Sequence, residues 1–139
     1  MSVSPENESA LMATYLLDTS VIIDALLGRR GRDALLKGLL LEGHLLACCP
    51  VNVAEIYAGM RPKEEAPTAQ FLKSLQYYEI SWDVARRAGL LKRDYARRGL
   101  TLSLADAMIA AVALTYRLPL LTDNVKHFPM KDLELYPLP

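Results

Sequence analysis

Cysteine is scarce in this chain, and so are long apolar runs. Only two cysteines occur among the 139 residues, and they are neighbours, Cys48 and Cys49. Adjacent residues of an extended segment point to opposite faces, so a disulfide between these two would be strained. We therefore expect two buried thiols and a reducing, cytoplasmic location, with neither a disulfide framework nor a zinc site.

Long hydrophobic runs are missing although hydrophobic residues make up 52% of the chain. No apolar run reaches the roughly 18 residues that a membrane-spanning helix needs. The longest candidate, 105–114, contains Asp106. The first residues also lack the basic start and apolar centre of a signal peptide. We expect no membrane association, a disordered leader at residues 1–12 and one domain at residues 13–139.

A charge excess of one sign is absent too, because 16 basic residues balance 16 acidic ones. Net charge therefore gives no general argument for a polyanionic partner. Two basic clusters, at 29–32 and 86–98, nevertheless weakly favour a nucleic-acid partner. If a metal site takes up four acids, the rest of the surface carries a net positive charge. Glycine-rich phosphate-binding motifs do not occur, so a nucleotide loop is not supported.

Short apolar segments alternate with helical periodicity along the chain. Such alternation is typical of parallel βαβ units, in which helices cover both faces of the sheet. The pattern predicts an α/β domain with a central parallel sheet of about four to five strands, and Gly59 is expected to cap a helix in the left-handed conformation. The expected strands are 15–17, 44–49, 77–81, 119–122 and 133–136, and the expected helices are 19–27, 33–41, 52–59, 67–75, 82–98 and 103–116.

Four carboxylates stand where the predicted strands end or where helices begin. Asp18 and Asp123 follow strands, while Glu55 and Asp106 are expected in the first turns of helices. Ligands bind at the carboxyl ends of parallel strands, and clustered acids are costly unless they are paired or bound to a metal. The four acids together predict a divalent-cation site and metal-assisted hydrolysis of a phosphodiester.

Each acid also has a purely structural explanation, in helix capping or turn formation. The hydroxyls nearby are equally open: Ser20 and Thr122 could orient a metal-bound water, and Asn124 could position a phosphate or simply form a turn. The structural alternatives are a helix cap at Asp18, capping boxes at Asn52/Glu55 and Ser103/Asp106, an Asx-turn at Asp123, an exposed polar face at Asp24 and a loop position beside Phe128 for His127.

Four segments of the chain, taken in order, resemble the PIN domain and, within it, the VapC-type toxins of prokaryotic toxin–antitoxin pairs. The resemblance covers nearly everything from Tyr15 to the C-terminus and implies a Rossmann-like α/β/α domain that uses Mg²⁺ or Mn²⁺ to cleave RNA. It also implies a homodimer and a small cognate antitoxin that covers the site. The segments are Leu-Asp-Thr-Ser-Val-Ile-Ile-Asp (17–24), Asn-Val-Ala-Glu-Ile-Tyr-Ala-Gly (52–59), Leu-Ala-Asp-Ala-Met-Ile-Ala-Ala (104–111) and Leu-Thr-Asp-Asn-Val-Lys-His-Phe (121–128).

The resemblance also implies roles for individual residues. All four acidic positions are present, so the chain is expected to be an active nuclease. Glu55 is implied as a metal ligand or as a general base, and a hydroxyl is implied next to the first and the last acid. Carried over by motif, the catalytic acids are Asp18, Glu55, Asp106 and Asp123, the metal ligands are Asp18, Asp106 and Asp123, and the supporting residues are Thr19, Ser20, Thr122 and Asn124.

Two other functions compete with this one. The strand-end sequence Asp18-Thr19-Ser20 is similar to that of aspartyl-phosphate enzymes of the haloacid dehalogenase type, but these need a second acid where Ser20 stands. The other alternative is a non-catalytic PIN-like module that only binds an antitoxin or RNA. Replacing Asp106 with Asn separates a nuclease from such a binding module, because only an enzyme has cleavage to lose.

Overall fold

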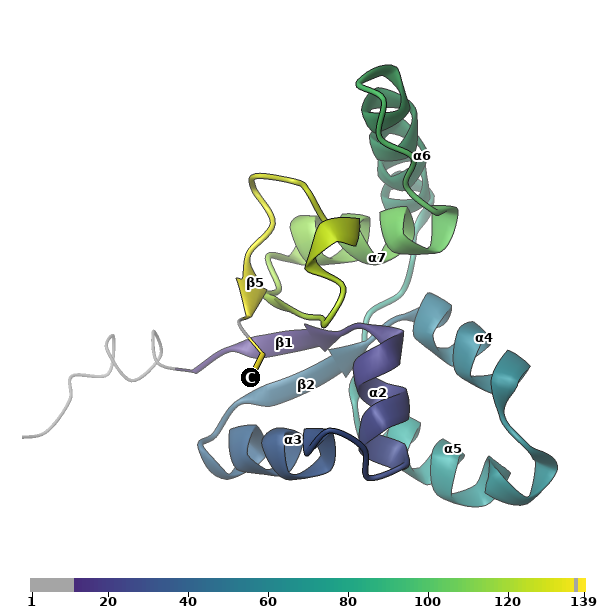
Figure 1. Ribbon diagram of the computed structural model, residues 1–139, viewed down its shortest axis with the longest axis vertical. Helices are drawn as coiled ribbons and strands as arrows, with labels where there is room; N and C mark the ends of the chain where they lie inside the picture. Colours follow the sequence, from purple (N-terminus) through teal and green to yellow (C-terminus); the bar gives the residue numbers. More distant parts are fainter. Residues whose placement is uncertain (1–11, 137) are drawn as a thin grey trace, which may run out of the picture.

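Five parallel strands form the central sheet of the computed structural model, which describes residues 12–136, 138 and 139 (Figure 1). The central strand β1 pairs with β2 on one side and β4 on the other. The strand order is β3-β2-β1-β4-β5. The strands are β1 (Thr14–Leu17), β2 (Leu45–Cys48), β3 (Gln76–Tyr77), β4 (Leu120–Leu121) and β5 (Leu135–Tyr136).

Helices cover both faces of this sheet. Figure 1 shows α6 and α7 on one side of β1 and β2, and α2, α3 and α5 on the other. The predicted α/β/α sandwich with a parallel sheet is confirmed. The helices are α2 (Thr19–Leu26), α3 (Arg32–Leu41), α4 (Pro50–Gly59), α5 (Glu65–Lys73), α6 (Trp82–Arg97) and α7 (Leu104–Tyr116), with short 3₁₀ turns η1 (Pro62–Glu64) and η2 (Val125–His127).

The alternation of side chains along β1 supplies both halves of the core. Leu16 and Leu17 are each fully buried, but they belong to different hydrophobic clusters. Leu16 packs with residues of α6 and α7, and Leu17 packs with residues of α2, α3, α4 and α5. Because both faces are covered, β1 is apolar at successive positions instead of alternating with polar residues.

Several local predictions differ from the structure. The third strand was expected over residues 77–81, but only Gln76 and Tyr77 pair with β2. Gly59 does not adopt the left-handed conformation; α4 ends because Met60 turns to an extended backbone. Most of the expected leader, residues 1–11, lies outside the described residues. Within the described part of the chain, no helix is both long and apolar enough to cross a bilayer.

Candidate active site

The candidate site lies where the strand order reverses on either side of β1. From β1, the chain adds β2 and β3 in one direction and β4 and β5 in the other. In open parallel sheets, ligands bind at this switch point, outside the carboxyl ends of the strands. Asp18 follows β1 and Thr122 follows β4, and the Asp18 amide donates a hydrogen bond of 2.9 Å to the Leu121 carbonyl. The two strand ends are thereby locked side by side.

Asp18 is the most deeply buried acid of the site, with 5% of its surface exposed. It caps α2, as its Oδ1 accepts a 2.9 Å hydrogen bond from the Thr19 amide, and its Oδ2 accepts one of 2.7 Å from Thr122 Oγ1. Burial raises the pKa of Asp18 and the charge of Asp106 raises it further, whereas hydrogen bonds from Thr122, Thr19 and Asn124 lower it. Capping and site placement therefore coexist in one residue.

Glu55 is tied to the same strand end through Thr19. The hydroxyl of Thr19 donates a 2.7 Å hydrogen bond to Glu55 Oε1. Glu55 is exposed and sits in the second turn of α4, not the first, because that helix begins at Pro50. A proline fits the first helical position since the missing amide has no partner there in any case. Glu55 thus faces the site from α4 while remaining open to solvent.

Asn52 is a site residue whose role was not predicted. It was expected to cap a helix, but it lies at the third position of α4, fully buried, and its Oδ1 accepts a 2.8 Å hydrogen bond from the Cys49 amide. Its Nδ2 donates to the Leu17 carbonyl at 3.1 Å and to Thr19 Oγ1 at 3.0 Å. Asn52 therefore fastens α4 to the end of β1 and orients the hydroxyl that holds Glu55. A lone amide among apolar neighbours was the available signal.

Asp106 enters from α7, on the opposite face of the sheet from α2. Ser103 caps this helix by accepting a 3.0 Å hydrogen bond from the Asp106 amide, so half of the predicted capping box is present. The Asp106 side chain is 22% exposed, and its Oδ2 lies 3.2 Å from Nδ1 of His127. Its charge raises the pKa of Asp18, with a smaller effect than burial and the hydrogen bonds from Thr122 and Thr19.

Asp123 makes different contacts from the other three acids. Its Oδ1 lies 2.7 Å from Nη2 of Arg32, and its Oδ2 lies 3.2 Å from Nη1 of Arg30. The neighbouring residues on either side, Thr122 and Asn124, both interact with Asp18. The structure therefore links Asp18 to Glu55 through Thr19, pairs Asp106 with His127, and turns the Asp123 carboxylate toward arginines.

The remaining predicted residues match the expectations only in part. Thr19 and Ser20 form the first turn of α2, and the Ser20 hydroxyl oxygen is buried without a hydrogen-bond partner among the described residues. The Asn124 amide donates a 2.9 Å hydrogen bond to Thr122 Oγ1, so the turn is built on Thr122 and not on Asp123. Asp24 is largely buried instead of exposed, and it lies 3.9 Å from Arg30.

The residues present fit a hydrated divalent cation better than a fully chelated one. Within residues 12–136, 138 and 139, no three His, Cys, Asp or Glu side chains are grouped as a ready-made metal site. The charge of Asp106 raises the pKa of Asp18, and none of the described arginines, lysines or histidines forms an ion pair with Asp18. Mg²⁺ keeps several of its own waters, so one or two carboxylates suffice as its protein ligands.

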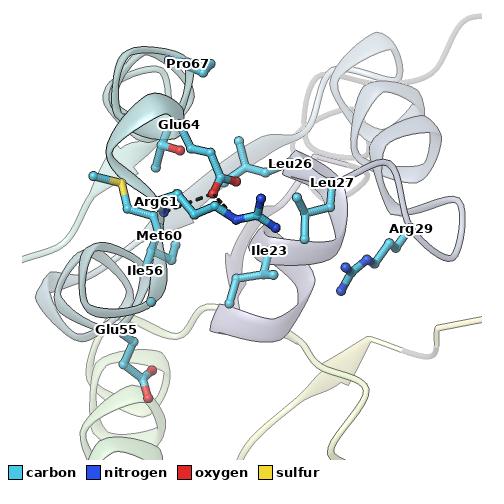
Figure 2. A pocket seen from close by; sticks show the side chains of 12 residues that line it. Ile23, Leu26, Leu27, Arg29, Glu55, Ile56, Met60, Arg61, Glu64 and Pro67 are labelled. Carbon is cyan, nitrogen blue, oxygen red and sulfur yellow. Dashed lines mark hydrogen bonds and ion pairs between the residues drawn. The ribbon is translucent and has the colours of Figure 1, made fainter.

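A groove of about 400 Å³ runs from Glu55 between α2 and the turn that joins α4 to α5 (Figure 2). Its walls are mixed: Ile23 from α2, Ile56 from α4 and Met60 after α4 are apolar, whereas Arg29 and Glu64 are charged. Arg61 lines it as well, and its amide donates a 3.0 Å hydrogen bond to Glu64 Oε1. The groove therefore places apolar side chains next to Glu55, one of the acids of the site.

Comparison with known sequences identifies relatives over most of the chain. The family model described as the PIN domain matches residues 15–130. Ribonuclease VapC19 of Mycobacterium tuberculosis is 34% identical over 115 residues, which cover 83% of this chain and 92% of that protein. Ribonuclease VapC10 of the same species is 37% identical over 116 residues, which cover 83% of this chain and 86% of that protein.

Solved structures with this fold include toxin–antitoxin complexes. The chain matches VapBC2 from Rickettsia felis, bound to a promoter DNA fragment, with a TM-score of 0.77 and 22% identity over 88% of this chain and 97% of that one. A toxin–antitoxin complex from Klebsiella pneumoniae gives a TM-score of 0.70 and 29% identity over 87% of this chain and 99% of that one. With the sheet order, the acids at the switch point and the sequence match in agreement, the chain belongs to the PIN-domain family.

Proposed function

We propose that this protein is an endoribonuclease and the toxin of a toxin–antitoxin pair. The observation that carries the proposal is the buried Asp18 at the switch point between β1 and β4, held there by Thr122, with the charge of Asp106 raising its pKa. Glu55 is linked to Asp18 through Thr19. The relatives that cover most of the chain are named ribonucleases, which favours RNA as the substrate.

The proposed cofactor is Mg²⁺ or Mn²⁺, held by Asp18 and Asp106. Asp18 is buried with a raised pKa and has no cationic partner among the described side chains, so a cation beside it would offset a desolvation cost. When bound, such an ion supplies a nucleophilic water at neutral pH and stabilises negative charge on the phosphate. It also reduces the repulsion that the acids would otherwise exert on an RNA phosphate.

The chain's own residues position the reacting groups. Thr122 and the Thr19 amide fix both oxygens of Asp18, so one carboxylate orientation is preorganised. Thr19 and Asn52 hold Glu55 at the solvent-facing edge. A carboxylate there can accept the proton of the attacking water, or it can bind the cation through water. Residue Asn124 is placed to donate to Asp18 or to a phosphate oxygen.

The proposed protein partner is an antitoxin that blocks the site through the groove shown in Figure 2. Structural relatives of this chain come from toxin–antitoxin complexes. The groove offers Ile23, Ile56 and Met60 to an apolar helix face and ends at Glu55, which would pair with a basic side chain of that helix. A homodimer stays a prediction from the family resemblance, and a cytoplasmic location stays a prediction from the two unpaired thiols.

Cleavage of a labelled single-stranded RNA by the purified protein, free of any antitoxin, tests the proposal. Wild type should cut in Mg²⁺ or Mn²⁺ and not in EDTA, and both Asp18→Asn and Asp106→Asn should abolish cutting while circular dichroism stays unchanged. Asp132→Asn, an exposed acid outside the site, is the matched control and should cut like wild type. If well-folded wild type cuts none of several structured and unstructured RNAs, a binding module is the better description.

A further inference from the structure

Arg32 is a buried arginine that is committed to Asp123. Only 2% of Arg32 is exposed, and it is among the largest fully buried side chains of the described residues. Its Nη2 lies 2.7 Å from Asp123 Oδ1, and its Nε lies 3.5 Å from Asp123 Oδ2. A guanidinium removed from water needs a charged or polar partner, and its planar fork matches a carboxylate. The interaction joins the first residue of α3 to the loop after β4, 91 positions away.

The same guanidinium contacts two further main-chain oxygens. Arg32 Nη2 donates to the Pro139 carbonyl at 3.1 Å, and Nη1 donates to the Arg30 carbonyl at 3.4 Å. Arg30 adds a second cation to Asp123, at 3.2 Å. Both oxygens of the Asp123 carboxylate are therefore taken by arginines. A divalent cation on this carboxylate would sit beside two guanidinium groups, which is electrostatically unfavourable.

The residues on both sides of Asp123 face the candidate site instead. Thr122 Oγ1 donates to Asp18 and accepts from the Asn124 amide, and the Asn124 side chain lowers the pKa of Asp18. The three residues thus divide between two directions, with the outer two on Asp18 and the middle one on Arg32. An anchor on Asp123 therefore fixes the positions of Thr122 and Asn124 relative to Asp18.

We propose that Arg32 is a positioning residue: by holding Asp123 it sets the loop after β4 so that Thr122 and Asn124 face Asp18, and Asp123 does not ligate the metal. The Arg32–Asp123 contact stands without the proposed nuclease function. Its consequence, faster RNA cleavage, rests on that function. It gives Asp123 a different role from the metal ligand that the sequence resemblance implies.

Binding of Mn²⁺ to the metal-free protein, measured by calorimetry, separates an anchor from a ligand. Asp106→Asn should weaken Mn²⁺ binding about tenfold or more, because it removes a charged ligand. Asp123→Asn should leave Mn²⁺ affinity close to that of wild type, as should the control Asp132→Asn. RNA cleavage by Asp123→Asn should nevertheless fall roughly 10- to 100-fold, because the loop is misplaced. A loss of Mn²⁺ affinity in Asp123→Asn equal to that in Asp106→Asn overturns the proposal.

Hydrogen exchange of the backbone amides at residues 122–124 tests the anchor without metal or RNA. Arg32→Met should accelerate exchange of the Asn124 amide, which is bonded to Thr122 Oγ1, far more than it accelerates exchange in β1. Leu36→Ala, a truncation of a buried residue on the same helix, is the control for general destabilisation. Equal acceleration at Asn124 in both variants overturns the anchor. Faster exchange only in Arg32→Met, together with no cleavage or Mn²⁺ binding by wild type, supports the anchor and rejects the nuclease.

Discussion

Thr122 donates a 2.7 Å hydrogen bond to Asp18 across 104 positions of the chain. Both residues follow strands that are neighbours in the sheet, so this side-chain hydrogen bond depends on the pairing of β1 with β4. The same bond fixes the orientation of the most buried acid of the site. One hydrogen bond thus serves both the fold and the proposed chemistry. A change at either residue should affect both the stability of the protein and its cleavage of RNA.

Replacing Thr122 with Val keeps the shape of the side chain and removes its hydroxyl. Asp18 then loses a buried donor, so we expect the free energy of unfolding to fall by about 1–2 kcal/mol. The pKa of Asp18 should rise further, because the lost hydrogen bond is one that lowers it. Urea unfolding followed by circular dichroism measures the stability change. Thr101→Val, at an exposed position, should change stability little; similar losses in both variants would contradict the assigned role.

The raised pKa of Asp18 makes a prediction about pH and stability. Folding raises this pKa above its usual 3.8, so the native state holds the proton more tightly than the unfolded chain does. The resulting contribution to stability is full below pH 3.8 and is lost as pH rises through the raised pKa of the folded state. In EDTA, Asp18→Asn should therefore gain stability relative to wild type between pH 4 and 7.

Urea unfolding of both proteins across this pH range measures the difference, since the other titrating groups are common to both and cancel. Adding Mn²⁺ at pH 7 should stabilise wild type and leave Asp18→Asn unchanged. A difference between the two proteins that does not vary with pH would show that Asp18 titrates near its usual value.

Replacing Asn52 with Leu should be strongly destabilising. The substitution removes the acceptor of the Cys49 amide and the donors to Leu17 and Thr19 in a fully buried place. Leaving a buried polar group unpaired costs about 1–3 kcal/mol, and the Cys49 amide and the Leu17 carbonyl both lose this partner, so we expect a loss of roughly 2–6 kcal/mol in total. Thermal and urea unfolding measure it, with the exposed Gln70→Leu as control. If Asn52→Leu loses less unfolding free energy than the control does, Asn52 does not stabilise the site.

The two thiols should be inert in the native protein. Cys48 and Cys49 are free and buried, and burial raises the pKa of Cys48 to about 11 and also raises that of Cys49. Since the thiolate is the reactive form, iodoacetamide at pH 8 should label neither thiol in the folded chain and both in urea. Mass spectrometry counts the labels, and an added exposed thiol, Ala85→Cys, shows that the reagent is active. Rapid labelling of the native protein would contradict the packing of β2.

The sheet, and the positions of Asp18 and Asp106 relative to it, could be predicted because their signals are local, while the catalytic role of these acids stays a prediction. A short apolar run followed by a carboxylate marks β1 and Asp18, and the apolar helix α7 starts at a Ser cap that places Asp106. The predicted start of α4 is wrong because a proline after an apolar run favours the end of a strand, whereas Pro50 is the first residue of a helix. That shift moved Glu55 by about one turn but left it beside the site.

The partner of Asp123 could not be predicted from the sequence. Arg32 stands in a basic cluster that looked like surface charge, and nothing local distinguishes an arginine that will be buried from one that remains in water. Its partner lies 91 positions away, so the ion pair depends on how α3 packs against the loop after β4. The same holds for His127, expected beside Phe128 in a loop and found against Asp106.

The outermost strands, β3 and β5, contribute only two residues each to the sheet. An exposed edge of a sheet is a template for pairing with another chain, and a short edge is a poor one. Copies of this protein therefore have little main chain on which to extend one sheet into the next, even when the concentration is high. We therefore expect little tendency toward fibre growth through these edges.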